Sequence, residues 1–343
     1  MSRLSDIPSI DLHEDISLYF LTHGGGLPYD DFGKDIARRE ADIPKYRAGG
    51  VRLVFAAIFP GIETFDPERS SSLESLYGKW LPGTKYRAPQ STTLEHFSIY
   101  YKMSEYYGIN IVQSYADAEK CLLEEGICFL LHLEGAEPLD DPYDLVIFKK
   151  LGLRSIGLTW NYSNKYGTGC LSKKDLGLTD LGEELIRNAN KLGIIVDLAH
   201  ASERTALDAL QISKRPAIIS HANAKKLVSK PRNVSDEILE ALKKNGGIIG
   251  ITAISSLVSN SSKPTIDDLV RHFAYIKESF GSDMLAIGTD FLGLMGLPAP
   301  EGFERVDKLP YLYGKLIESG FSEEDIKSIA YRNALRVLMK NLE

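Results

Sequence analysis

The most constraining feature of this sequence is a regular alternation of short apolar, β-branched runs with longer amphipathic, charged segments. Eight of the short runs are almost continuously apolar, which is the pattern of strands buried on both faces of a parallel sheet. These runs are Ser9–His13, Val51–Ala57, Ile127–Leu133, Arg154–Trp160, Ile194–His200, Ala217–His221, Gly247–Thr252 and Leu285–Asp290.

The segments between the runs carry start and stop signals of α-helices. Thr179 can cap a helix that ends at Gly193, and Ser235 can cap another. Strand and helix alternating eight times predict an α/β fold, a single TIM-type (β/α)8 barrel, with an open doubly wound sheet as the alternative. We expect residues 1–343 to form one domain, with a long loop insertion at about residues 61–90.

Charge and composition narrow the functional classes. The net charge is −7 and no dense run of lysine and arginine occurs, which argues against nucleic acid or an anionic membrane as a partner. No apolar signal-peptide core or membrane-spanning stretch is visible, so we expect a soluble, cytoplasmic protein. The odd number of cysteines, Cys121, Cys128 and Cys170, without a C-x-x-C pair, predicts that no disulfide framework forms.

Ionisable side chains gather at the carboxyl ends of five predicted strands. In a (β/α) barrel these ends face one bowl, where active sites lie. Each residue alone is weak support, because a single histidine or carboxylate at a strand end is usually a satisfied polar group or a helix cap. Together they indicate a site formed by His13, Asp15, Glu134, His200, His221 and Asp290.

Three histidines and three carboxylates at one buried point require a compensating cation. Their number favours two divalent ions, each with several ligands. We expect one ion on His13, Asp15 and Glu134, and the other on Glu134, His200 and His221. Glu134 bridges, since a carboxylate offers two oxygens. Nitrogen and oxygen ligands without thiolate favour Zn²⁺, with Mn²⁺, Fe²⁺ or Co²⁺ as alternatives.

Three further residues are expected near this site. Arg232, in KPRNVSD, has a planar guanidinium that can clamp a carboxylate; the alternative is a solvated loop arginine. Asp11 shares a strand face with His13 and can orient it, the alternative being an ordinary buried hydrogen bond. His132 is expected one layer below Glu134, as support and not as a ligand.

The motifs resemble the membrane dipeptidase (renal dipeptidase) family of the amidohydrolase superfamily, nearly end to end. The likeness includes DLHED at 11–15, LEGAE at 133–137, VDLAHAS at 196–202, ISHANAKKLVSKPRNVSDE at 219–237 and AIGTDFLG at 286–293. The resemblance implies a TIM barrel with a binuclear zinc site that hydrolyses dipeptides, including those with a C-terminal D-residue. It implies the same five metal ligands, Asp290 as the acid/base residue and Arg232 as the binder of the substrate carboxylate.

Three positions depart from the family pattern. Trp160 stands where well-known members have a substrate-contacting histidine, and we place it in the substrate site. Ile254 replaces a pocket tyrosine, and Leu292 replaces the second aspartate of an aspartate-phenylalanine-aspartate run. Two alternatives to a dipeptidase stay open: a hydrolase of N-acyl amino acids or lactones, and a non-catalytic metal-binding homologue. The family's membrane anchor has no expected counterpart, and a homodimer is a candidate assembly.

Overall fold

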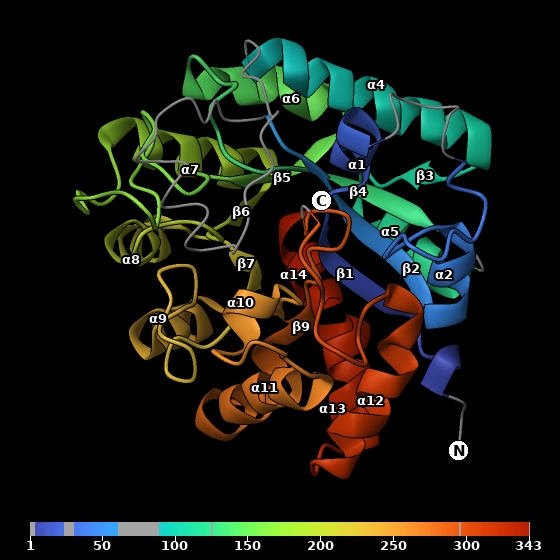
Figure 1. The fold of residues 1–343 in the computed structure, drawn as a ribbon. Coiled ribbons are helices and arrows are strands. Elements are labelled where there is room, and N and C mark those ends of the chain that lie inside the picture. The colour runs from blue at the N-terminus through green and yellow to red at the C-terminus, as the bar shows by residue number, and fades with distance from the viewer. Residues whose placement is uncertain (1–3, 24–30, 61–88, 125, 295, 343) are drawn as a thin grey trace.

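Eight parallel strands close into a barrel surrounded by helices in this computed structural model (Figure 1). The structure describes residues 4–23, 31–60, 89–124, 126–294 and 296–342. The strand order is β2-β1-β9-β8-β7-β6-β5-β4-β3, and an additional pairing of β2 with β4 closes the barrel. The predicted (β/α)8 architecture is therefore confirmed. Most of the predicted loop insertion, residues 61–88, lies outside the described residues.

Every predicted apolar run overlaps one barrel strand, and all but one of the barrel-strand residues are buried, Arg52 being half-buried. The largest differences from prediction are at β6 and β9, where the chain leaves the sheet at Asp197 and Ile287, well before His200 and Asp290. The strands are β1 (Ser9–Glu14), β2 (Val51–Ile58), β4 (Cys128–Leu133), β5 (Leu153–Gly157), β6 (Ile195–Asp197), β7 (Ile218–Ala222), β8 (Ile248–Ile251) and β9 (Leu285–Ile287), with β3 (Asn110–Ile111) added beside β4.

The helices begin and end where capping chemistry allows. The Thr179 hydroxyl accepts from the Gly182 amide at the start of α7, and Gly193 ends that helix with φ 70°. The helices are α1 (Ile16–His23), α2 (Ile43–Gly49), α4 (Pro89–Tyr107), α5 (Tyr115–Leu123), α6 (Leu145–Lys150), α7 (Asp180–Leu192), α8 (Glu203–Ile212), α9 (Asp236–Asn245), α10 (Ser255–Val258), α11 (Ile266–Phe280), α12 (Leu309–Glu318), α13 (Glu323–Lys327) and α14 (Asn333–Asn341).

The core has two parts because strand side chains alternate between the barrel interior and the surrounding helices. Val54, Phe129 and Ile219 belong to the large cluster that packs against the helices. Residues that alternate with them along the strands point the other way and pack with α14 in a second cluster. This cluster includes Leu53, Leu130, Ile195, Ile218, Val337 and Leu338. The lower interior is therefore apolar, and polar side chains begin only toward the carboxyl ends of the strands.

The prediction for the cysteines was wrong for two of the three. Cys121 in α5 and Cys128 at the start of β4 form a disulfide, with Cα atoms 6.3 Å apart. This pair was not predictable from the spacing of the cysteines, because the two residues come within bonding distance only when α5 packs beside β4. Cys170 is a free thiol.

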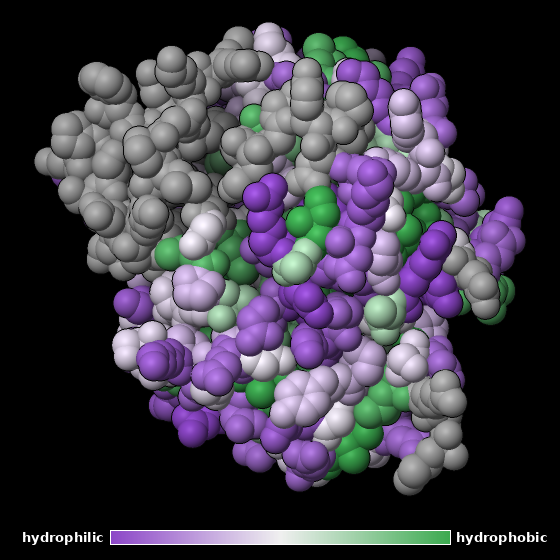
Figure 2. All heavy atoms as spheres, turned by 45° about the vertical axis from the view of Figure 1, so that its right-hand side comes forward, coloured by the Kyte–Doolittle hydropathy of each residue, from purple (hydrophilic) through white to green (hydrophobic). Residues whose placement is uncertain are grey.

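Hydrophilic side chains cover much of the face drawn in Figure 2, and apolar side chains appear there in separate groups. Among the described residues, no helix has both the length and the apolar character needed to span a bilayer.

Candidate active site

The structure brings all six predicted strand-end residues together at the carboxyl end of the barrel. None of the six is more than 6% exposed, so they share one buried environment. Their positions are His13 within β1, Asp15 just after β1, Glu134 just after β4, His200 in the turn after β6, His221 within β7 and Asp290 in the turn after β9.

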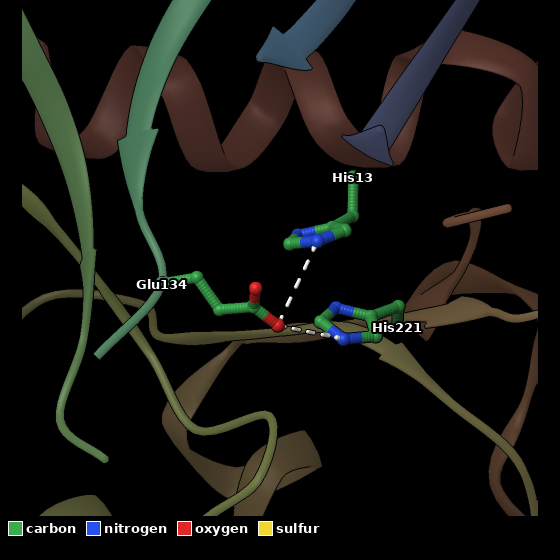
Figure 3. Close-up of side chains that lie close together, drawn as sticks. All are labelled: His13, Glu134 and His221. Carbon is green, nitrogen blue, oxygen red and sulfur yellow. Dashed lines mark ion pairs between the residues drawn. The ribbon is translucent and has the colours of Figure 1, made fainter. Parts of the chain in front are cut away.

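Glu134 lies at the centre of the histidines. Its Oε1 is 2.9 Å from His200 Nε2, 3.4 Å from His221 Nε2 and 3.7 Å from His13 Nε2. Figure 3 shows the His13 and His221 rings one above the other on the same side of this carboxylate, with one of its oxygens facing a nitrogen of each ring. One oxygen therefore faces three imidazole nitrogens that come from three different strands.

His13 joins this group to a second cluster of carboxylates. Its Nε2 is 3.6 Å from Asp15 Oδ2 and 3.7 Å from Asp290 Oδ1. Two sets of donor atoms therefore lie close enough to hold an ion, His13 with Glu134 and His221, and His13 with Asp15 and Asp290. This grouping places His13 between the two sets and adds Asp290 to one of them, whereas the sequence assigned His13 to a single ion.

Four of these groups lie in an environment that disfavours their charged form. Burial raises the pKa of Glu134 well above its usual value, and the charges of Asp15 and Asp290 raise it further. Burial likewise raises the pKa of Asp290, with Asp15 adding to the effect. Burial lowers the pKa of His200 and His221 well below the usual value. A divalent cation would favour ionised carboxylates and neutral imidazoles, which is the state that metal ligation needs.

The ring orientation of His200 is set by a neutral amide. Asn161 Oδ1 lies 2.7 Å from His200 Nδ1, and an amide oxygen can only accept a hydrogen bond. The proton must therefore be on Nδ1, which leaves the Nε2 lone pair free toward Glu134. Asn161 was not identified from the sequence, because it lies in the loop after β5, 39 residues away along the chain.

A serine and a carboxylate fix His221 in the same way. Ser220 Oγ donates its one proton to Asp197 Oδ2 at 2.6 Å, so it must accept from His221 Nδ1 at 2.8 Å. The Nε2 of His221 is then the free nitrogen. Support of this kind by outer hydrogen bonds is typical of histidines that bind metals. Neither Ser220 nor Asp197 was singled out by the sequence analysis.

His132 lies below this layer, as predicted, and touches no carboxylate of the upper cluster. Its Nε2 is 3.3 Å from Asp197 Oδ2, and its Nδ1 is 2.9 Å from Ser155 Oγ. Burial would raise the pKa of Asp197, but hydrogen bonds from His132 and Ser220 hold it below its usual value. An ionised carboxylate is therefore maintained beneath His221.

Asp11 acts on the backbone and not on the imidazole that it was expected to orient. Its Oδ1 accepts from the backbone N–H groups of His13 and Thr289, and its Oδ2 accepts from the Thr289 hydroxyl. Burial raises the pKa of Asp11 to about 6. Asp11 thus ties β1 to the turn after β9, the two segments that carry His13 and Asp290.

Two of the site residues have a left-handed backbone conformation, which sets the direction of their side chains. His200 has φ 65° and Asp290 has φ 63°, a conformation that non-glycine residues adopt rarely and often at functional sites. Gly293, just beyond, leaves room for the carboxylates, since a Cβ atom there would lie 2.1 Å from Asp15 Oδ2. The turn after β9 therefore allows Asp15 and Asp290 to approach each other.

Arg232 is buried at 3% exposure, which excludes the solvated-loop alternative. Its Nη2 donates to the His221 carbonyl at 2.8 Å, while its Nε has no hydrogen-bond partner in the described part of the chain. A buried guanidinium that has an unpaired Nε donor and is bonded to the backbone of His221 can bind an anionic group.

The Trp160 indole stacks on the imidazole ring of His200. The two rings are nearly parallel, with centroids 5.7 Å apart, and Phe59 packs 5.4 Å from the indole. Leu18 completes this apolar group. The group lines one cavity together with Asp15, Glu134 and Asp290, so an apolar wall faces the carboxylates. Ile254 and Leu292 are both buried, and Leu292 has φ 65°.

The donor set fits divalent cations. Among the described residues, neither ring nitrogen of His13 nor Oδ1 of Asp15 has a hydrogen-bond partner, although all three atoms are buried. Unsatisfied buried nitrogen and carboxylate oxygen atoms that point at one another are costly unless an ion accepts their lone pairs. Imidazole and carboxylate ligands without thiolate suit Zn²⁺ and related ions.

Comparison with known proteins agrees with this geometry. Residues 2–343 match the profile of the membrane dipeptidase family, peptidase family M19. An uncharacterized dipeptidase of Schizosaccharomyces pombe is 30% identical over 345 residues, covering 97% of this chain and 81% of the relative. The dipeptidase ataJ of Aspergillus terreus is 32% identical over 372 residues, covering 99% and 86%.

A solved structure shares the fold over its full length. It is a metallopeptidase from Rhodobacter sphaeroides bound to a phosphinate mimic of the dipeptide L-Ala-D-Ala. The TM-score is 0.84 at 24% identity, with 98% of this chain and 99% of the other covered.

Proposed function

This chain belongs to the membrane dipeptidase family, and on that premise we propose that it is a metal-dependent hydrolase that cleaves dipeptides with two divalent ions, Zn²⁺ being the preferred metal. The observation that carries the proposal is the convergence of three histidines and three carboxylates, all buried, around donor atoms that lack partners. The proposed ligands are His13, Asp15, Glu134, His200 and His221, with Glu134 shared.

When bound, the two ions supply Lewis acidity that polarises the scissile carbonyl and lowers the pKa of the attacking water. The residues of the chain then handle the protons. Hydrolysis adds the hydroxyl of one water to the carbonyl carbon and one proton to the leaving nitrogen. We assign Asp290 to accept the proton from the water and to deliver it to the amine. The raised pKa of Asp290 in its buried position suits both steps.

Arg232 is assigned to the free carboxylate of the substrate. Its buried guanidinium has an unused Nε donor, and it is anchored to the His221 carbonyl. A charge-assisted hydrogen bond to a carboxylate is the strong kind. With the scissile bond at the ligands and the terminal carboxylate at Arg232, a substrate with one residue beyond the cleaved bond is favoured.

Trp160 is assigned to the other side of the substrate. Together with Phe59 and Leu18 it forms an apolar wall beside Glu134 and Asp290. We expect this wall to favour an apolar side chain on the residue that supplies the scissile carbonyl, where family members with histidine would contact the substrate through a polar ring. Since a solved relative holds a mimic of L-Ala-D-Ala, dipeptides with a C-terminal D-residue belong in the proposal.

The test combines metal content with a substrate panel. Protein purified without chelator is expected to contain about two equivalents of metal per chain and to hydrolyse apolar dipeptides. Turnover of N-acyl amino acids or lactones without any turnover of dipeptides would favour the alternative hydrolase. An Asp290→Asn variant that keeps its metal but loses turnover would exclude a purely metal-binding role.

A further inference from the structure

A second cavity lies at the amino end of the barrel, opposite the metal ligands. It has a volume of about 80 Å³ and lies among the end of α6, the start of β5, the end of α7 and the segment before β7. Four of its lining residues are cationic, Lys149, Arg154, Lys191 and Arg215, and none of the described lining residues is acidic. In a chain whose net charge is −7, this concentration of positive charge is local.

Neutral oxygens hold these cations in place. Arg154, only 7% exposed, donates from Nε to the Gln113 carbonyl at 2.7 Å and from Nη1 to the Lys149 and Leu153 carbonyls at 3.0 and 2.8 Å. Lys149 Nζ donates to the Leu192 carbonyl at 2.6 Å. These contacts orient the cations but do not neutralise them, since each acceptor is uncharged.

Three of the cations have no acidic partner at ion-pair distance among the described residues. Within the described residues, Lys149, Arg154 and Lys191 form no ion pair within the 4.0 Å limit. Burial lowers the pKa of the Arg154 guanidinium, the direction expected for a cation held away from water without a counter-charge. The charges that act on Arg154 are those of Tyr101 and Asp117, and neither group forms an ion pair with it in the described part of the chain.

Helix polarity explains only part of this arrangement. Lys149 and Lys191 each lie in the last turn of a helix, where a cation is favoured by the helix dipole. That effect does not account for Arg154, which lies at the start of a buried strand, or for the open space between the three side chains. The space exceeds that of one water, whose share of liquid volume is about 30 Å³.

We propose that this cavity binds a small multivalent oxyanion with the geometry of inorganic phosphate, held by Lys149, Lys191 and Arg154. Tetrahedral oxyanions present several acceptors at once, and lysine and arginine are the usual donors to them. The site is independent of the proposed hydrolysis, because its residues lie at the opposite end of the strands from His13 and Glu134.

The test is calorimetric titration of inorganic phosphate into the metal-loaded full-length protein at constant ionic strength. The binding variant is the double substitution Lys149→Gln and Lys191→Gln. The matched control is Lys150→Gln, the exposed neighbour on α6, which carries the same charge but does not line the cavity. We expect one saturable site that weakens by at least about tenfold in the double variant and is unchanged in the control.

Three outcomes would overturn the proposal: no saturable binding, equal loss in Lys150→Gln, or full binding in the double variant, which would place the phosphate at the metal centre. Dipeptide turnover is measured in parallel. It is expected to be equal in all three proteins, so a failure of the proposed hydrolase leaves this result readable.

Discussion

The two ends of the barrel carry opposite kinds of uncompensated charge. At the carboxyl end, Asp15, Glu134 and Asp290 lie together with three imidazoles, and Asp15 and His13 have buried atoms without partners. At the amino end, Lys149, Arg154 and Lys191 surround a cavity without an acidic lining residue among those described. The same parallel strands thus connect a site suited to cations with a site suited to an anion.

The difference lies in how each end is built. Strand ends and their first turns supply the carboxyl-end groups, and buried neutral partners such as Asn161 and Ser220 hold them in one orientation. The amino-end cations sit mainly on the last turns of helices, and carbonyl oxygens hold them. We therefore expect the carboxyl end to bind its ions tightly with defined geometry, and the amino end to bind weakly and reversibly.

The largest effect is expected from removing the shared carboxylate. Glu134→Gln keeps the shape but removes the charge that faces three histidines, so metal content should fall. Dipeptide turnover should then drop by at least about 10³-fold, or about 4 kcal/mol. Elemental analysis and kcat/KM are the measurements. Full metal content with normal turnover would show that the carboxyl end is not a cation site.

Metal affinity should depend strongly on pH. The raised pKa values of Glu134 and Asp290 mean that these groups hold protons which an arriving ion must displace. The lowered pKa values of His200 and His221 keep the imidazoles neutral, so they do not oppose binding. Affinity is therefore present at high pH and is lost as pH falls through the raised carboxyl values.

For each proton displaced per ion, affinity should weaken about tenfold for each pH unit below the raised carboxyl pKa values. Competition with a chelating dye at each pH measures this, and the metal-induced rise in Tm should follow the same trend. Phosphate binding at the amino end should not show this pattern. A metal affinity that is flat with pH would contradict the role given to the carboxylates.

Arg232 is a cation whose charge acts on Glu134 and Asp290, so its removal tests the contrast between the two ends of the barrel. Arg232→Ala should raise KM for dipeptides by about 50-fold with little change in kcat, because a charge-assisted hydrogen bond to the substrate is lost. Lys230→Ala in the same loop is the control. Dipeptide amides, which lack the carboxylate, should show the same KM in wild type and variant; a 50-fold rise there too would indicate structural damage.

A smaller effect is expected one layer below the ligands. Ser220→Ala removes the hydroxyl between Asp197 and His221 Nδ1, so the ring loses its fixed tautomer. Metal affinity should fall by about tenfold, the low end for such supporting contacts. Ser155→Ala removes the hydroxyl that contacts His132 Nδ1 and should leave the affinity unchanged. Equal losses in both variants would mean that the layer acts by general packing.

Much of the carboxyl end could be predicted from the sequence, because ligand types occur where apolar runs stop and parallel strands bring those stops together. The positions of His13, Glu134 and His221 followed from this rule alone. The division of these residues into two metal-binding sets could not be predicted. The left-handed turn that carries Asp290, and the glycine beyond it, decide which carboxylate lies near His13.

The supporting residues and the amino end were not predictable in the same way. Asn161 and Ser220 are neutral residues whose role appears only when distant segments meet. Lys149 and Lys191 of the amino-end cavity look, in sequence, like ordinary lysines in a last helical turn. The Cys121–Cys128 bond likewise depends on α5 packing beside β4. Sequence patterns report where a strand ends, but contacts between non-adjacent loops require the folded chain.

The pairing of β1 with β9 has a consequence for biosynthesis. His13 is made long before β9, and its strand lacks one neighbour until β9 has been made, since Asp11 pairs with Ile287. A growing chain on the ribosome therefore carries the early site residues before the barrel closes, and we expect metal capture to be one of the last events of maturation. Metal occupancy in a cell would then report the fraction of chains that have closed their barrel.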